Sequence, residues 1–248
     1  MYHHFDGGDL SSDAGLLLIK EFISKLHFDK LISSIFHTND FSSRRTHKDD
    51  ANLLQVIYQI FSAYYEDDCA DELTNDPILT AVLAKKSLAS QPTLSRFYNR
   101  MDDNTLRQFD NHMKAMRRIV YKITHMYTFI VTNMTVDIKS VIKFYCGRGN
   151  MENFIKESKN GFDFGAVSSH SKLVNANRLQ IHALSYNIFN WFKRLALCAS
   201  MKKQCADTIR LKLIKIAVKV VRSGRYIYFK LCSSCPYISV LRNTHQYK

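Results

Sequence analysis

The chain has 248 residues, of which 46% are hydrophobic and only three are proline. This composition is typical of a folded globular chain and excludes a disordered one. The formal net charge of +13 indicates an anionic partner, either nucleic acid or an acidic membrane surface.

The charge is distributed unevenly along the chain. Residues 1–110 hold 11 Lys and Arg against 17 Asp and Glu, a net of −6, whereas residues 111–248 hold 24 against 5, a net of +19. We therefore predict an acidic, helical N-terminal region over 1–125 and a basic C-terminal region over 126–248 that faces phosphate.

The sequence argues against a membrane partner. No apolar run approaches the roughly 18 residues that a membrane span needs. The first residues, MYHHFDGG, lack the basic stretch and apolar core of a secretory signal. We expect a cytoplasmic chain with reduced cysteines.

The N-terminal region has the pattern of amphipathic helices. Ser11-Ser12-Asp13 is predicted to cap a first helix in AGLLLIKEFISKL, a short second helix covers 29–36, and a polar loop covers 38–50. Helical periodicity resumes at Asp50. Six carboxylates between 66 and 76 follow, and we interpret them as a solvated acidic turn rather than a metal site.

A capped segment over 88–100 follows, LASQPTLSRFYNR. Ser90 is a predicted N-cap and Pro92 suits the first helical turn. A short helix at 90–100 beginning Thr-Leu-Ser-Arg96 is typical of a recognition helix, so it is a candidate for DNA contact, although plain packing would give the same pattern. A long helix is predicted over 102–123, with cations in its last turns.

The segment Tyr145–Lys159 reads YCGRGNMENFIKESK, after a predicted strand at 127–133. Tyr145, Arg148, Glu152 and Lys159 fall near one face if the segment is helical throughout. Such a face offers a carboxylate for a divalent metal and cations for phosphate. A solvated helix of mixed charge is the plainer interpretation.

The C-terminal part is predicted to contain a long helix over 173–197, whose aromatic stripe is expected in the core. A cationic amphipathic helix over 207–218 carries Arg210 and Lys215. A β-hairpin turns at Ser223-Gly224 and carries Arg222, Arg225 and two tyrosines. Basic residues interleaved with tyrosines fit a nucleic-acid contact, and a solvated hairpin face fits equally.

The spacing of the Tyr145–Lys159 segment resembles the Tyr-(2)-Arg-(3)-Glu-(6)-Lys signature of one branch of the DDE-type insertion-sequence transposases. Further segments resemble this family in the same order: SSDAGLLLIKEF, the acidic NDP turn, LASQPTLSRFYNR, ANRLQIHALSYNIFN, ADTIRLKLIKIAVKVVRSGRYI and CSSCPY. The resemblance implies an RNase H-like fold and an Asp-Asp-Glu triad that binds two divalent ions, Mg²⁺ in the first instance. It also implies that the substrate is DNA at the terminal inverted repeats of the element.

The two aspartates of that triad have no counterpart in this sequence. Glu152 matches the family glutamate, and the other acids of the basic half are Asp137, Glu157, Asp163 and Asp207. None of them lies in a predicted strand. Only one strand is predicted between 124 and 145, whereas an RNase H-like sheet needs about five. We infer that an internal segment is missing and that the join falls near 123–127.

The predicted fold is therefore mainly α: a helical N-terminal region followed by a truncated remnant of an RNase H-like α/β catalytic domain with a C-terminal β-hairpin. The predicted function is DNA binding without catalysis, and whether the chain is an enzyme stays open. Glu152 is the candidate catalytic and metal-binding residue, with Mg²⁺ not expected to bind productively. The candidate DNA-binding residues are Tyr145, Arg148, Lys159, Arg96, Arg210, Lys215, Arg222 and Arg225.

The expected partners are element-end DNA, together with a full-length transposase or a second copy of the chain as a dimer. Three alternatives stay open. The chain is an active nuclease that recruits Asp137 or Asp163 beside Glu152, or a basic nucleic-acid-binding protein unrelated to transposition, or a non-functional remnant.

Overall fold

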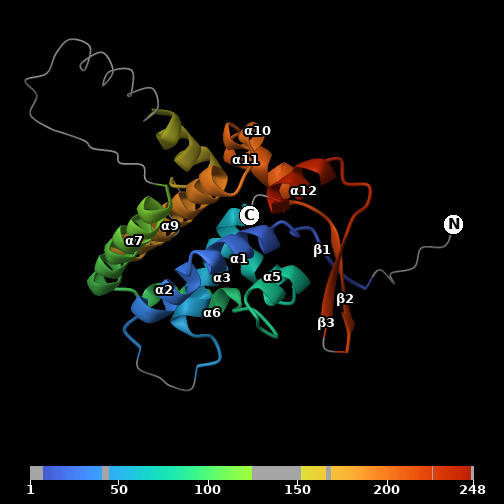
Figure 1. Cartoon of the computed structure of the whole chain (residues 1–248). Coiled ribbons are helices and arrows are strands. Elements are labelled where there is room, and N and C mark those ends of the chain that lie inside the picture. Colours follow the sequence, from blue (N-terminus) through green and yellow to red (C-terminus); the bar gives the residue numbers. More distant parts are fainter. Residues whose placement is uncertain (1–7, 41–44, 125–151, 166–168, 225, 247–248) are drawn as a thin grey trace, which may run out of the picture.

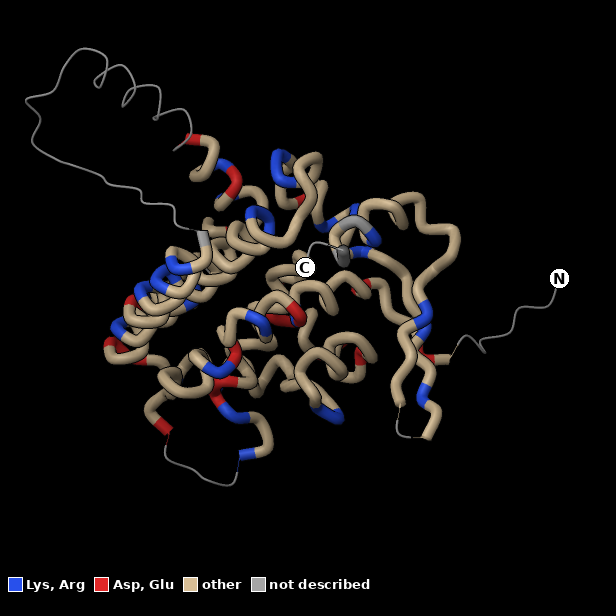
Figure 2. Tube along the Cα trace, in the orientation of Figure 1, with Lys and Arg blue, Asp and Glu red and all other residues tan. Residues whose placement is uncertain are grey.

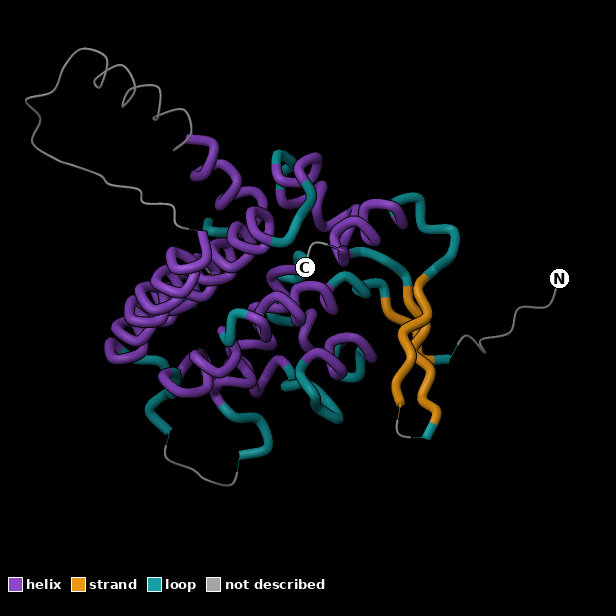
Figure 3. The backbone as a smooth tube through the Cα atoms, in the orientation of Figure 1, coloured by secondary structure: helices purple, strands orange, loops and turns teal. Residues whose placement is uncertain are grey.

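The computed structural model describes residues 8–40, 45–124, 152–165, 169–224 and 226–246. Helices dominate, and one small antiparallel sheet lies at the side of the molecule (Figures 1 and 3). This arrangement confirms the prediction of a mainly α chain with a C-terminal hairpin. The elements in chain order are β1 (Asp9–Ser11), α1 (Leu16–Lys25), α2 (Phe28–Ile35), α3 (Asp49–Phe61), α4 (Cys69–Glu72), α5 (Pro77–Val82), α6 (Gln91–Asn99), α7 (Asp103–Thr124), an unlabelled helical stretch 152–162, α9 (Lys172–Leu195), α10 (Ala199–Lys202), α11 (Ala206–Ile209), a π-helical turn η1 (Arg210–Ile214), β2 (Val218–Ser223), β3 (Tyr226–Leu231) and α12 (Ile238–Gln246).

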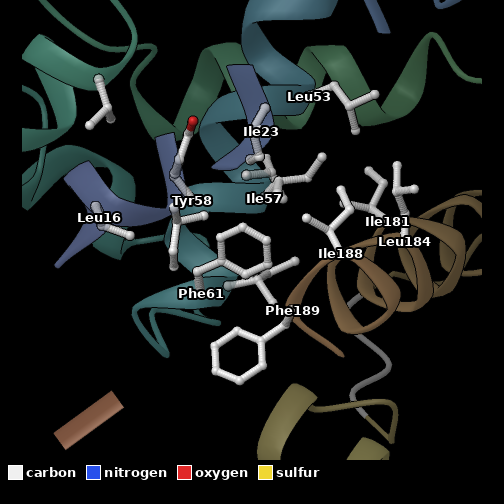
Figure 4. Close-up of a cluster of buried hydrophobic side chains, with 14 of the residues drawn as sticks. Leu16, Ile23, Leu53, Ile57, Tyr58, Phe61, Ile181, Leu184, Ile188 and Phe189 are labelled. Carbon is white, nitrogen blue, oxygen red and sulfur yellow. The ribbon is translucent and has the colours of Figure 1, made fainter. Parts of the chain in front are cut away.

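The core lies between α3 and α9, the two helices with the most extensive apolar faces. Leu53, Ile57 and Phe61 of α3 face the apolar stripe of α9, as Figure 4 shows. The rings of Phe61 and Phe189 lie 5.9 Å apart between centroids. The aromatic stripe predicted over 173–197 is thus a core face. The core is one cluster that takes residues from both sides of the predicted boundary at 125/126.

The polar loop between α2 and α3 is held by a buried carboxylate. Asp49 is 5% exposed and accepts hydrogen bonds from the backbone N–H and the hydroxyl of Thr38, both at 2.8 Å. Arg45 donates to its other oxygen at 2.5 Å. Burial by itself would raise the pKa of Asp49, but these hydrogen bonds outweigh it and lower the pKa below the ordinary value.

The sheet has the order β1-β2-β3, with both pairs antiparallel. The hairpin of β2 and β3 was predicted, whereas β1 was not. The prediction that Ser11-Ser12-Asp13 caps the first helix is wrong: Gly15 is the N-cap of α1 and gives no side-chain bond. Asp13 is buried instead and accepts from the Tyr64 hydroxyl at 2.8 Å.

The cationic helix predicted over 207–218 ends earlier, at Ile214. Here the main chain is hydrogen-bonded to the segment before α1. The N–H of Gly15 donates to the carbonyl of Ile214 and the N–H of Ala14 donates to that of Ile216, each at 3.1 Å. The last helical turn is widened to a π-helix, and β2 begins after three intervening residues. The strand predicted at 127–133 lies outside the described residues.

Candidate nucleic-acid interface

The signature segment is described only in part. Tyr145 and Arg148 lie outside the described residues, and Glu152 opens the helical stretch 152–162. Glu152 and Lys159 are both exposed, and their offset of seven puts them on one helical face. The structure therefore places two of the four signature residues on one face of a helix, about 10 Å apart along its axis.

The two ends of this helical stretch differ in how they pack. Phe162 at its end is fully buried, with its ring 5.3 Å from that of Phe189. The Tyr65 hydroxyl donates to the carbonyl of Gly161 at 2.7 Å. Near the other end, Phe154 and Ile155 are 53% and 50% exposed. The helix is thus anchored at its C-terminal end and projects an apolar, unburied surface at its start.

The described carboxylates of the basic half do not converge on Glu152. Asp163 follows the far end of the same helix, about 16 Å away along the axis for eleven residues. Glu157 pairs with Lys193 at 3.6 Å, and Asp207 pairs with Arg210 at 2.8 Å. No group of three or more His, Cys, Asp or Glu in the described ranges could hold a metal ion. The residues described here therefore do not fit the two-metal site that the signature implies. Asp137 lies outside the described residues.

The acidic segment 66–76 is more than the solvated turn that was predicted. Asp67 receives two hydrogen bonds from the guanidinium of Arg178, at 2.9 and 2.5 Å. Asp71 accepts from the N–H of Gln91 at 2.8 Å, and Asp76 caps α5. Three of the six carboxylates thus have structural roles.

The segment predicted as a capped helix at 90–100 is confirmed as α6. Ser90 is the N-cap, although its side chain makes no capping bond, and a proline lies in the first turn. Leu94, Phe97 and Tyr98 are buried, whereas Arg96 is exposed. The helix therefore packs on one face and leaves Arg96 available to a partner.

Two of the predicted DNA contacts have partners within the protein. Arg210 is 3% exposed, and its guanidinium donates to the main-chain carbonyls of Phe61 and Ile60 at 2.9 and 3.1 Å. The ammonium of Lys215 lies 2.8 Å from a carboxylate oxygen of the buried Asp13. Arg210 is therefore buried in the helical core, and the prediction that it faces DNA is wrong. Lys215 is half-buried, with 30% of its side chain exposed, so its contact with DNA stays a prediction.

The hairpin presents its cations differently. Arg222 is exposed near the end of β2, and Arg225 lies outside the described residues. Arg222 lines a groove of about 790 Å³ that runs between the hairpin on one side and α5 with the segment that follows it on the other. Lys85 and Lys86 line the other side, and none of the lining residues is a carboxylate. We call this feature the basic groove.

The two lysines of the basic groove were not predicted. The adjacent Lys-Lys pair shortly before the recognition-like helix could have indicated a basic surface. Lys86 is exposed, whereas Lys85 is half-buried with its Nζ 3.3 Å from Nδ1 of His47. Burial lowers the pKa of Lys85, and a nearby Asp50 opposes that shift. The pKa of His47 is lowered by burial and by the charge of Lys85.

A second basic surface follows α7, on the side of the molecule away from the hairpin (Figures 1 and 2). Its exposed cations include Arg107, Arg118 and Lys122, which recur at helical spacing. Lys114 on the same face pairs with Asp110 at 2.6 Å. The described chain thus offers two separate cationic surfaces.

Comparison with known families now decides what kind of protein carries these surfaces. The sequence model of the family described as "Transposase DDE domain group 1" matches residues 1–127 and, in a second match, residues 114–247. The chain belongs to this transposase family. No curated protein and no solved structure matches the chain.

The two matches to the transposase family cover both ends of the chain and overlap at 114–127. That overlap includes residues 123–127, where a join was predicted. DDE transposases act on DNA and generally use divalent metal ions. No helix in the described parts of this transposase-family chain is long and apolar enough to cross a membrane.

Proposed function

We propose that this chain is an internally shortened transposase that binds the DNA ends of its insertion sequence but does not cut them. The observation that carries the proposal is the basic groove. Lys85, Lys86 and Arg222 come from distant parts of the sequence and meet along a groove lined by no carboxylate. Cations gathered in this way attract a phosphate backbone.

The arrangement of the carboxylates supports the proposed lack of cleavage. In-line phosphoryl transfer by two metals needs several acids around one point. Glu152 opens the helical stretch 152–162 at its exposed end, and Asp163 follows the opposite, buried end. A missing internal segment that carried the catalytic sheet and both aspartates accounts for this, and also for the exposed Phe154 and Ile155. A full-length transposase or a second copy of the chain would be a partner at the element ends.

The test is a fluorescence-anisotropy titration of the purified chain with two duplexes, the terminal inverted repeat of the element and a scrambled sequence. Each is measured at two salt concentrations. We expect tighter binding to the repeat, and an affinity that falls steeply with salt because phosphate contacts release counterions. Equal affinity for both duplexes would mean that the chain binds DNA only through its positive charge and does not recognise the element ends. An affinity that does not change with salt would contradict a phosphate interface.

A pair of matched variants locates the interface. Lys86→Gln with Arg222→Gln removes two exposed charges from the basic groove. Arg118→Gln with Lys122→Gln removes the same two charges from α7. We expect the groove variant to weaken binding to both duplexes and to lower the slope of log affinity against log salt by about two, with little change for the α7 variant. The reverse result would move the interface to α7.

A further inference from the structure

The solvent-facing side of the three-stranded sheet combines aromatic rings with cations. Residues opposite each other in an antiparallel pair share a face of the sheet. Lys219 pairs with both Leu10 and Lys230, Val221 pairs with Tyr228, and Ser223 pairs with Tyr226. We call the face formed by Leu10, Lys219, Val221, Tyr226, Tyr228 and Lys230 the sheet platform.

The aromatic part of the sheet platform is open to solvent. Tyr226 and Tyr228 are 69% and 50% exposed, and Leu10 is 59% exposed. The two rings lie 6.3 Å apart between centroids and are tilted by 46°. Large apolar groups are seldom left this exposed together without a partner, because their contact with water is unfavourable.

The cations of the sheet platform lie directly opposite each other. Lys219 of β2 pairs in register with Lys230 of β3, and both are exposed. Like charges at such positions repel and destabilise the pairing, and a bound anion would remove that cost. No carboxylate belongs to this face, since Asp9 pairs with Val220 and so lies on the other side.

We propose that the sheet platform binds single-stranded DNA, with bases stacked on Tyr226 and Tyr228 and phosphates on Lys219 and Lys230. Exposed aromatic rings beside cations on a sheet are how single-stranded nucleic acids are held without sequence preference. A second copy of the chain would fit less well, because self-association through this face would bring four lysines together. The inference extends the proposed DNA binding to unpaired strands, and Tyr226 also borders the basic groove.

The first test compares a fluorescein-labelled single strand of about 16 nucleotides with the duplex of the same sequence. Because Tyr226 borders the basic groove, Tyr228→Ala is the cleaner variant. We expect it to weaken single-strand binding about tenfold and Tyr228→Trp to preserve it, while duplex affinity changes less than about twofold. Tyr121→Ala, which removes an exposed tyrosine on α7, is the control and should change neither.

A second measurement does not depend on loss of binding. The chain has one tryptophan, Trp191, which is 7% exposed. In Tyr228→Trp a new, exposed indole is added, and stacking of a base on it should quench its emission as single strand is titrated. Absence of quenching at saturating single strand, or unchanged affinity in a folded Tyr228→Ala, overturns the inference. The same holds if sedimentation without DNA shows a dimer that Tyr228→Ala dissociates.

The outcomes separate this inference from the proposed function. Duplex binding through the basic groove with no effect of Tyr228 on single strands would reject only the sheet platform. If the unchanged chain binds no duplex but binds single strands in a way that depends on Tyr228, only the proposed function is rejected.

Discussion

The guanidinium of Arg210 donates to the main-chain carbonyl of Phe61 at 2.9 Å and so connects η1 to the C-terminal end of α3. The same guanidinium lies 4.7 Å above the ring of Phe162. One cation from the basic part of the sequence thus reaches the last carbonyls of a core helix, where the regular pattern of helical hydrogen bonds ends.

We predict that Arg210→Ala lowers the free energy of unfolding by about 3 kcal/mol, because it leaves the carbonyl of Phe61 without its side-chain donor and opens a cavity beside the buried ring of Phe162. Urea titration followed by circular dichroism measures the change. Arg222→Ala, an exposed arginine in the hairpin, is the control and should stay within about 0.5 kcal/mol. If Arg210→Ala instead weakens DNA binding without loss of stability, the buried role is wrong.

The lowered pKa of Asp49 predicts that the free energy of unfolding decreases in acid. Its pKa in the folded chain is lowered, so the unfolded state binds the proton more tightly than the folded state. The stabilisation is fully present above about pH 4, the ordinary value for an aspartate, and is lost as the pH falls through the lower folded value. Asp49→Asn should cost about 2 kcal/mol at neutral pH and should flatten the decline in stability below pH 4.

The neighbouring Asp50 gives the control for this measurement. It lies in the same first turn of α3 but is only half-buried, and Asp50→Asn should change stability by about 0.5 kcal/mol or less. Equal acid profiles for Asp49→Asn and the unchanged chain would mean that Asp49 is not held in its charged form by Thr38 and Arg45.

Local patterns predicted most of the helices. Periodicity over 102–123 and 173–197 identified α7 and α9 to within two residues at either end, and the Ser-Gly pair located the hairpin turn. These features depend on residues close in sequence. The three residues of β1 carry no such pattern, because that strand exists only through its pairing with β2.

The candidate interface was harder to predict, because charge in a sequence does not show which cations are exposed. Arg210 belongs to a cationic pattern, yet its long-range contact with Phe61 buries it, and Lys215 of the same pattern pairs with the buried Asp13. Lys86 and Arg222 lie more than a hundred residues apart and form one groove only in the folded chain. Tertiary contacts decide which cations are buried and which meet in a groove, and a single sequence does not show those contacts.

The close contact at Gly15 predicts that a single added methyl group destabilises the fold. A Cβ at this position would lie 1.7 Å from the main-chain carbonyl oxygen of Leu213, so α1 and η1 could not approach as they do. Gly15→Ala should therefore cost about 3 kcal/mol, at the upper end of overpacking effects. Gly165→Ala, where a Cβ would meet nothing within 4 Å, should leave the thermal midpoint unchanged. A neutral Gly15→Ala would show that the contact between α1 and η1 is adjustable.

Glu152 gives the prediction that bears on catalysis. We expect no nicking of an element-end duplex by the purified chain with Mg²⁺ or Mn²⁺, because no group of three or more His, Cys, Asp or Glu among the described residues could hold a metal ion, and Asp163 lies about 16 Å from Glu152 along the helix. Glu152→Gln and the unchanged chain should then behave alike on a denaturing gel of labelled duplex. Metal-dependent nicking that disappears in Glu152→Gln would mean that this carboxylate still acts with other acids, and the chain would have to be treated as an active nuclease.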